Sequence, residues 1–112
     1  MKLKYLALCV PLVLGSGAAV AETNFDMAAV NDALRNNACL ACHAVENKLV
    51  GPSYKEIAEA NKDDAANADI LKAHIKEGSS GVWGPIPMPA NPNVSDDDLT
   101  LIVDWLMAGA PQ

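Results

Sequence analysis

Apolar side chains recur at helical spacing in several stretches of the 112-residue chain, and no stretch shows the strict alternation of a β-strand. The first stretch predicts a helix that begins near Thr23 or Asn24 and runs into Asn37. Its apolar positions are spaced three and four residues apart and form one face: Met27, Val30 and Leu34. The pattern therefore predicts an all-α fold of helices joined by loops.

Two further helices are predicted in the middle of the chain. Ser53 and Glu56 form a capping-box pattern, which predicts a short helix that extends through Ala60. A longer helix is expected over residues 65–77, and Gly78 ends it. The apolar stripe of this longer helix comprises Ile70, Leu71 and Ile75, with His74 at its border.

The last part of the sequence combines a long loop with a strongly signalled helix. Residues 79–93 contain glycine and proline turns and no helical period, so we expect an irregular loop there. Ser95 is suited to cap the following helix, and the acidic residues 96–98 suit its positively polarised first turn. Gly109 ends this helix, whose apolar positions are Leu99, Ile102, Val103 and Leu106.

Residues 1–21 are expected to be a secretory signal peptide that is removed. Lys2 and Lys4 precede an apolar run over residues 6–14, and the small residues 19–21 form a cleavage site. This run is shorter than the roughly 20 residues that a membrane-spanning helix needs, so we expect no membrane anchor. Residues 22–112 would then form one small exported domain.

The charge of the chain restricts its partners. The sequence has 8 basic and 14 acidic residues, and loss of Lys2 and Lys4 with the leader changes the formal charge from −6 to −8. Nucleic acid is therefore excluded as a partner. A partner that is attracted by charge should present a basic or neutral surface.

Cys39, Cys42 and His43 form a Cys-x-x-Cys-His motif, which is typical of the covalent attachment of a c-type haem. Each thiol can form a thioether with one haem vinyl group, and the adjacent imidazole can bind the iron as its proximal ligand. Cys9 lies in the expected leader, so one haem would use both remaining cysteines. A haem-attachment motif in an exported chain indicates a bacterial periplasm.

Two other kinds of site use similar residues: a thioredoxin-like redox pair and half of a zinc site. A thioredoxin motif is expected in a strand–helix–strand context, and this helix-patterned chain shows no strand pattern. A structural zinc site needs four ligands, and His74 is the one further histidine of the sequence. The sequence therefore favours the haem.

The second axial ligand decides what such a haem can do. With His43 alone the iron would be open to small molecules, whereas a second protein ligand leaves electron transfer as the available chemistry. Met88 is favoured because the prolines at positions 87 and 89 fix its backbone and lower the entropy lost on ligation. The alternatives are that Met88 packs on the core or that His74 is the ligand.

Three segments together resemble the short class I cytochromes c of bacterial periplasms, over essentially all of residues 22–112. They are the Cys-x-x-Cys-His motif, residues 50–52 (Val-Gly-Pro) and residues 81–89 with Asn91, whereas Ala90 stands where relatives often have a further proline. The resemblance implies a small all-α fold of about four helices wrapped around one covalent haem c. It also implies that Met88 is the distal ligand of the iron.

The resemblance further assigns supporting roles around the haem. It implies that the Pro52 carbonyl accepts a hydrogen bond from His43 Nδ1, that Trp83 donates to a haem propionate, and that Asn91 supports the methionine segment. His74 stands where relatives often have Arg or Lys near a propionate.

By resemblance, the protein is expected to be a monomeric periplasmic carrier of single electrons between redox proteins, and not itself an enzyme. The implied acceptors are a nitrite reductase, a terminal oxidase or a peroxidase. Two alternatives remain open. One is a five-coordinate haem protein that binds or reduces a small ligand, and the other is a haem subunit of a larger redox complex.

Overall fold

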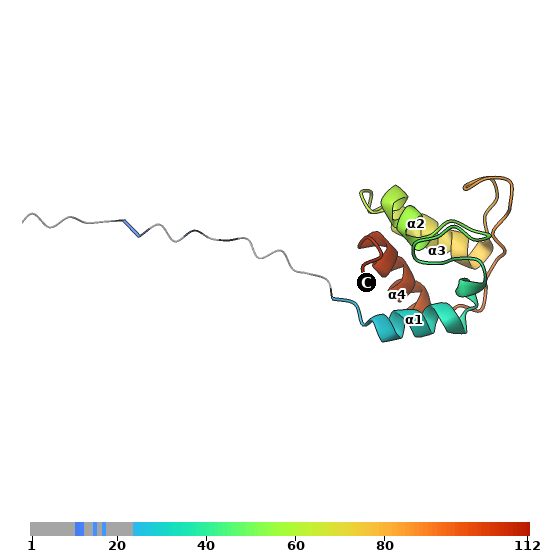
Figure 1. Ribbon diagram of the computed structural model, residues 1–112, viewed down its shortest axis with the longest axis horizontal. Coiled ribbons are helices and arrows are strands. Elements are labelled where there is room, and N and C mark those ends of the chain that lie inside the picture. The colour runs from blue at the N-terminus through green and yellow to red at the C-terminus, as the bar shows by residue number, and fades with distance from the viewer. Residues whose placement is uncertain (1–10, 13–14, 16, 18–23) are drawn as a thin grey trace, which may run out of the picture.

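The computed structural model describes residues 11–12, 15, 17 and 24–112, and its regular structure is helical (Figure 1). The expected signal peptide falls almost wholly outside these residues, so it stays a prediction. The elements are α1 (Met27–Asn36), the 3-10 helix η1 (Cys39–Ala41), α2 (Tyr54–Asn61), α3 (Asn67–Glu77) and α4 (Asp96–Met107). No helix in the described part of the chain is long and apolar enough to span a bilayer.

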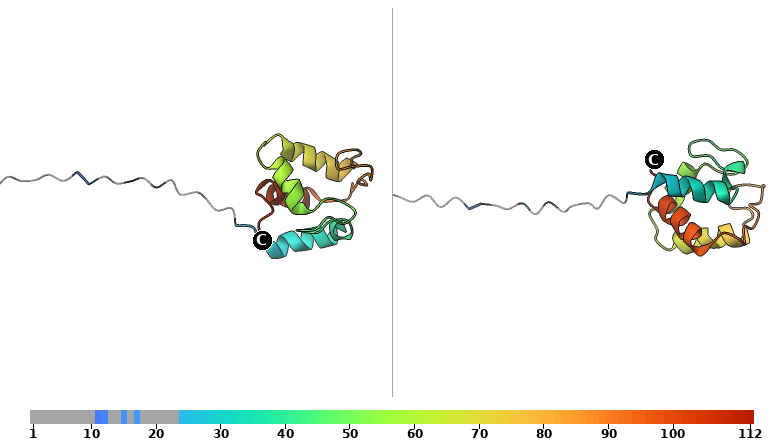
Figure 2. Two further views of the ribbon diagram at one scale, coloured as in Figure 1. Left: turned by 45° about the horizontal axis from the view of Figure 1, so that its top comes forward. Right: turned by 90° about the horizontal axis from the view of Figure 1, so that it is seen from below.

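Helix α4 is the centre of the fold. It contacts α1 on one side and α2 and α3 on the other, as the views in Figures 1 and 2 agree. Trp105 on α4 is fully buried, and its indole Nε1 donates a hydrogen bond to the Pro111 carbonyl at 2.8 Å. The residues around it are apolar and include Val30, Leu34, Ile57, Leu71, Ile102, Val103 and Leu106. The four-helix, all-α prediction is therefore confirmed.

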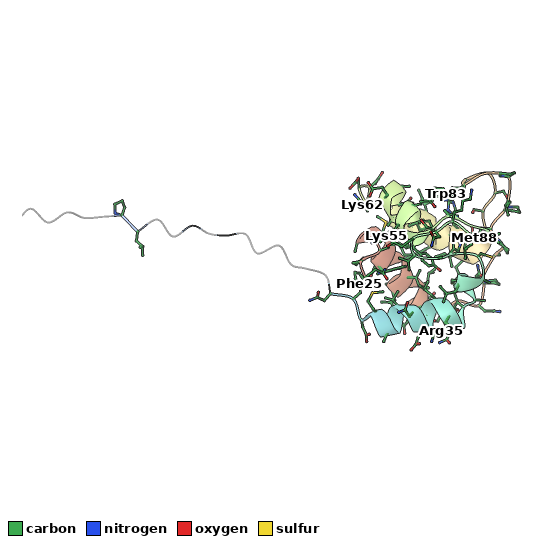
Figure 3. The ribbon with its side chains drawn as sticks, viewed as in Figure 1. Phe25, Arg35, Lys55, Lys62, Trp83 and Met88 are labelled. Carbon is green, nitrogen blue, oxygen red and sulfur yellow. The ribbon has the colours of Figure 1, made fainter. Side chains whose placement is uncertain are left out.

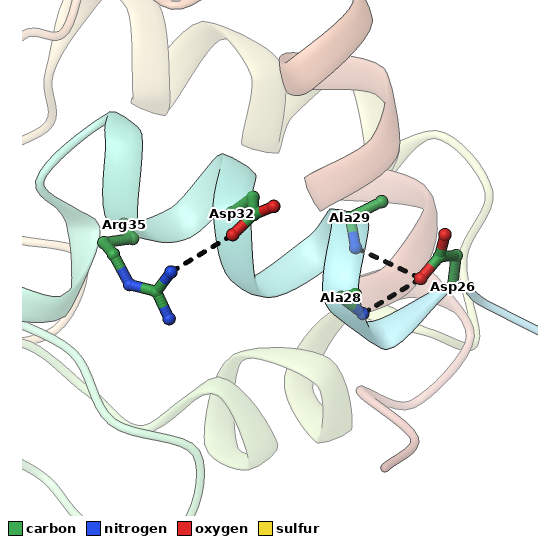
Figure 4. A network of polar contacts seen from close by, with 5 residues as sticks. All are labelled: Asp26, Ala28, Ala29, Asp32 and Arg35. Carbon is green, nitrogen blue, oxygen red and sulfur yellow. Dashed lines mark hydrogen bonds and ion pairs between the residues drawn. The ribbon is translucent and has the colours of Figure 1, made fainter.

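The start of α1 differs from the prediction. The helix does not begin near Thr23 or Asn24, because Asp26 acts as its N-cap. The Asp26 carboxylate accepts hydrogen bonds from the backbone N–H groups of Ala28 at 3.0 Å and Ala29 at 3.2 Å (Figure 4). These bonds satisfy donors that the first turn of a helix leaves free, so the helix begins after the aspartate.

The predicted caps of α2 and α4 are present. Ser53 Oγ accepts a hydrogen bond from the Glu56 N–H at 3.1 Å, and the Ser53 N–H donates to the Glu56 carboxylate at 2.8 Å. At the start of α4, Ser95 Oγ accepts from the Asp98 N–H at 3.1 Å. Both helices therefore begin where the local sequence places them.

Helix α3 starts at Asn67, two residues later than predicted. The preceding residues form a turn in which the Asp64 carboxylate accepts a hydrogen bond from the Ala66 N–H at 3.0 Å. The predicted apolar stripe is also wrong for Ile70, which is 48% exposed, whereas Leu71 is 8% exposed. The inward face follows Leu71 and Ile75, and Ile70 lies to the side of that line.

The segment between α3 and α4 is irregular, as predicted. Residues 79–93 contain no helix, and an isolated antiparallel bridge joins Ser79 to Met88. We call residues 79–94 the methionine loop.

Candidate functional site

A cleft opens at the end of the domain that lies away from Phe25, and Trp83 and Met88 are found at this end (Figure 3). All four α-helices, η1 and the methionine loop contribute to its walls. The deepest wall residues are apolar and come from every α-helix: Leu34, Ile57, Leu71, Ile102 and Leu106. The cleft can therefore receive a large apolar group.

The structure brings most of the predicted site residues together in this cleft. The predicted residues that line it are Cys39, Cys42, His43, Pro52, Trp83 and Met88, and His74 lines it as well. Asn91 lies outside the lining and contacts the methionine loop instead. Its side-chain amide donates a hydrogen bond to the Pro89 carbonyl at 3.2 Å.

The His43 imidazole is held in one orientation. Its Nδ1 lies 2.7 Å from the Pro52 carbonyl oxygen, in a buried hydrogen bond. Because a carbonyl can only accept, Nδ1 carries the proton and the lone pair of Nε2 is available to a metal. This is the contact that the family resemblance implied.

Gly51 makes room for the His43 ring, and the sequence did not identify this role. A Cβ atom at position 51 would lie 2.9 Å from Nδ1 and 3.1 Å from Nε2 of the imidazole. Such distances are shorter than normal packing allows, so any side chain here would displace the ring. The glycine next to a proline was a weak signal of close backbone approach.

Cys39 and Cys42 are free thiols that line the cleft. Both are partly exposed, and η1 places them on consecutive turns of the chain beside His43. Burial raises the pKa of the Cys39 thiol, and the negative charges of Asp98 and ionised Cys42 add to the rise. Because both thiols are unpaired, partly exposed and line the cleft, both sulfurs are available for covalent attachment of a group that fills it.

Met88 is the partly buried residue of a segment that is otherwise exposed. From Gly81 to Ala90, the other residues are exposed to solvent. The Met88 N–H donates to the Ser79 carbonyl at 2.9 Å, and the Ser79 N–H donates to the Met88 carbonyl at 3.1 Å. The loop therefore presents one thioether to the cleft from a fixed backbone position.

Tyr54 is a further cleft residue that the sequence did not single out. It is 3% exposed, and its ring centroid lies 5.5 Å from that of His43 and 5.2 Å from that of Trp105. Its hydroxyl group has no hydrogen-bond partner among the described residues. In the sequence it is the first residue of the capped helix after Ser53, and no motif marks it as part of a site.

This set of side chains fits a haem attached through its vinyl groups. The cleft offers two thiols, an imidazole with an available Nε2, a thioether and apolar walls. The zinc alternative lacks support here, since no group of three or more His, Cys, Asp or Glu side chains within the described residues could hold a metal ion. A thioredoxin-like pair would need a strand, and residues 24–112 contain isolated bridges instead of strands.

The chain is similar to known proteins over the region that forms this cleft. Residues 28–110 match the family model described as Cytochrome c. A cytochrome c-552 of Nitrosomonas europaea is 55% identical over 78 residues, which cover 68% of this chain and 74% of the relative. A cytochrome c-551 of Stutzerimonas stutzeri is 46% identical over 74 residues, covering 66% of this chain and 70% of the relative.

A solved structure shows the same similarity in three dimensions. The crystal structure of wild-type Nitrosomonas europaea cytochrome c552 aligns with this chain with a TM-score of 0.66 and 51% sequence identity. The alignment covers 69% of this chain and 95% of the crystallised one.

Proposed function

The chain belongs to the cytochrome c family, and from this premise we propose that it carries single electrons on one haem c held between His43 and Met88. The haem is attached covalently through Cys39 and Cys42. The observation that carries the proposal is that the oriented imidazole of His43 and the thioether of Met88 line the same cleft.

The side chains of the cleft have distinct tasks in this proposal. When bound, the haem supplies an iron that cycles between its ferric and ferrous states. Pro52 keeps the proton on His43 Nδ1 and thereby directs Nε2 into the cleft. Met88, which lines the same cleft, would be the second protein ligand of the iron and would close it to small molecules. The apolar walls exclude water, which favours the less charged, reduced form.

The supporting roles of Trp83 and Asn91 belong to the same proposal. Trp83 is 44% exposed and lines the cleft, so its indole N–H is free to donate to a haem propionate. Asn91 holds the Pro89 carbonyl and so restrains the segment that follows Met88.

A Met88→Ala variant tests the axial assignment. We expect the haem to stay attached, the weak sulfur-to-iron charge-transfer band to disappear, the reduced protein to bind carbon monoxide and the reduction potential to fall. Met107→Ala is the matched control, because Met107 packs against the core from α4 and does not line the cleft. An unchanged spectrum and potential in Met88→Ala would favour the five-coordinate alternative.

We propose that the protein works in the periplasm after removal of residues 1–21, as a monomer that is not itself an enzyme. The leader pattern, the haem-attachment motif and the family support this assignment.

Redox proteins are its proposed partners. Its formal charge of −8 without the leader favours a basic partner. Electron transfer to a basic partner should slow several-fold as salt shortens the Debye length from about 10 Å at 0.1 M to about 3 Å at 1 M. Cofractionation of the haem protein with a large complex would favour the subunit alternative.

A further inference from the structure

The methionine loop cannot hold its own shape by backbone hydrogen bonds alone. It contains prolines at positions 85, 87, 89 and 92, which have no N–H group to donate. The Ser79 bridge fixes Met88 from the side that precedes it, with two hydrogen bonds of 2.9 and 3.1 Å. After Met88 the loop has two hydrogen bonds of its own, from the Asn91 side chain to the Pro89 carbonyl at 3.2 Å and from the Val94 N–H to the Asn91 carbonyl at 3.3 Å. Its attachment to the rest of the domain therefore depends on groups outside the loop.

The last turn of α3 supplies those groups. The Ile75 carbonyl accepts a hydrogen bond from the Asn91 N–H at 2.9 Å. The Lys76 ammonium donates to the Pro92 carbonyl at 3.3 Å and also to the Val94 carbonyl. Lys76 takes part in no ion pair among the described residues, so its charge is directed at these two carbonyl oxygens.

Gly78, at the end of α3, lets the loop pass directly against the helix. Its φ angle is +80°, and a Cβ atom there would lie 2.7 Å from the Met88 carbonyl oxygen and 3.0 Å from the Ala90 nitrogen. The backbone of the methionine segment therefore rests on the bare Cα of this glycine. Any side chain at position 78 would push Met88 and Ala90 away from α3.

We propose that Lys76 and Gly78 are positioning residues for Met88. This inference rests on the proposed axial role of Met88. Gly78 sets how closely the methionine loop approaches α3. Lys76 restrains the C-terminal end of the loop through its hydrogen bonds to the Pro92 and Val94 carbonyls. Together they restrain the opening motion by which the Met88 thioether would leave the iron.

The test for Lys76 uses Lys76→Met in the haem-loaded protein, with Lys72→Met as the control. Lys72 lies on the same helix, and its ammonium group makes no hydrogen bond or ion pair among the described residues. The probe is free imidazole, which binds the ferric iron after Met88 has departed. We expect Lys76→Met to accelerate imidazole binding roughly tenfold, because hydrogen bonds from a charged donor are stronger than neutral ones. Lys76→Arg should restore most of the original rate.

The test for Gly78 compares Gly78→Ala with Gly109→Ala. Gly109 also follows a helix and has a φ angle of +98°, but a Cβ atom there would meet nothing within 4 Å. Both variants suffer the same kind of backbone strain, which circular dichroism reports as a lower unfolding temperature. We expect only Gly78→Ala to lose the charge-transfer band at temperatures where its helices are still folded.

Equal imidazole rates in Lys76→Met and Lys72→Met would overturn the role of Lys76. Parallel loss of the charge-transfer band and of helicity in Gly78→Ala would overturn the role of Gly78. These outcomes differ from failure of the proposed function, in which Met88→Ala itself would leave the spectrum unchanged.

Discussion

The Cα atom of Gly51 lies so close to the His43 imidazole that a methyl group on it would come within 2.9 Å of Nδ1. Gly51→Ala should therefore displace the ring and weaken its 2.7 Å hydrogen bond to the Pro52 carbonyl. We expect a loss of about 1–3 kcal/mol in the free energy of unfolding, typical of an overpacked site. Denaturant titration gives this loss, and the visible spectrum should show altered axial ligation.

Ser53→Ala is the control for Gly51→Ala. It removes the hydroxyl that accepts the Glu56 N–H, which costs about 1 kcal/mol of stability without adding an atom beside His43. Its visible spectrum should match that of the unmodified protein. If Gly51→Ala also keeps a normal spectrum, the close approach of Gly51 to the imidazole has no effect on His43 as a ligand.

The covalent anchors should be essential for folding. Apolar side chains line the cleft and have no protein packing partner across it among the described residues, in a domain whose core is already small. The haem therefore supplies packing that the chain itself lacks. We expect Cys39→Ala combined with Cys42→Ala to yield a largely unfolded chain in circular dichroism. Cys39→Ala alone keeps one anchor and should retain more helix. A native-like helical spectrum in a haem-free sample of the double variant would contradict this expectation.

The buried hydroxyl of Tyr54 should make stability depend on alkaline pH. Burial raises the pKa of Tyr54, and ionised Cys39 and Cys42 add to the rise, although thioether formation would remove their share. The unfolded chain then loses this proton at a lower pH than the folded protein. The stabilisation is complete below the ordinary pKa of about 10 and is lost as the pH rises above it.

Denaturant titrations of Tyr54→Phe measure this effect. The unmodified protein should lose up to about 1.4 kcal/mol of unfolding free energy per pH unit above pH 10 through this group. Tyr54→Phe should lack that part of the slope, while the difference between the two proteins stays constant below pH 9. Identical slopes above pH 10 would show that the Tyr54 hydroxyl ionises as easily in the folded protein.

The link between α1 and η1 contains a strained residue. Ala38 has a φ angle of +58°, a left-handed conformation that costs an L-residue with a Cβ atom about 1–2 kcal/mol. We expect Ala38→Gly to raise the free energy of unfolding by about 0.5–1 kcal/mol after the greater entropy of the unfolded glycine is included. Ala66→Gly, at a φ angle of −63°, should lower it instead.

The sequence predicted features that depend on neighbouring residues. The Ser53 and Ser95 caps and the Cys-x-x-Cys-His motif are local patterns, and local hydrogen bonds or direct chemistry explain each of them. The start of α1 was misplaced because both Asn24 and Asp26 are suitable caps, and a pattern of residue types does not rank them. In the structure the Asp26 carboxylate accepts hydrogen bonds from the Ala28 and Ala29 N–H groups, so the helix begins after Asp26.

Contacts between distant segments could not be predicted in the same way. Lys76 is an ordinary surface residue of a helix until the chain brings the Pro92 and Val94 carbonyls beside it. The sequence predicted Gly78 as the residue that ends a helix. Its second role, to allow close approach of the Met88 backbone, depends on where the loop passes the helix. Such roles depend on tertiary placement, which a single sequence does not encode in any short pattern.

The central position of α4 has a consequence for the order of synthesis. Helices α1, α2 and α3 each pack mainly on α4 and little on one another, and α4 follows all three along the chain. A nascent chain that ends before Asp96 therefore has no surface on which its earlier helices can assemble. The polypeptide should remain unfolded throughout translation of those helices, which would suit the proposed export and would leave both thiols of the motif accessible until the final helix emerges.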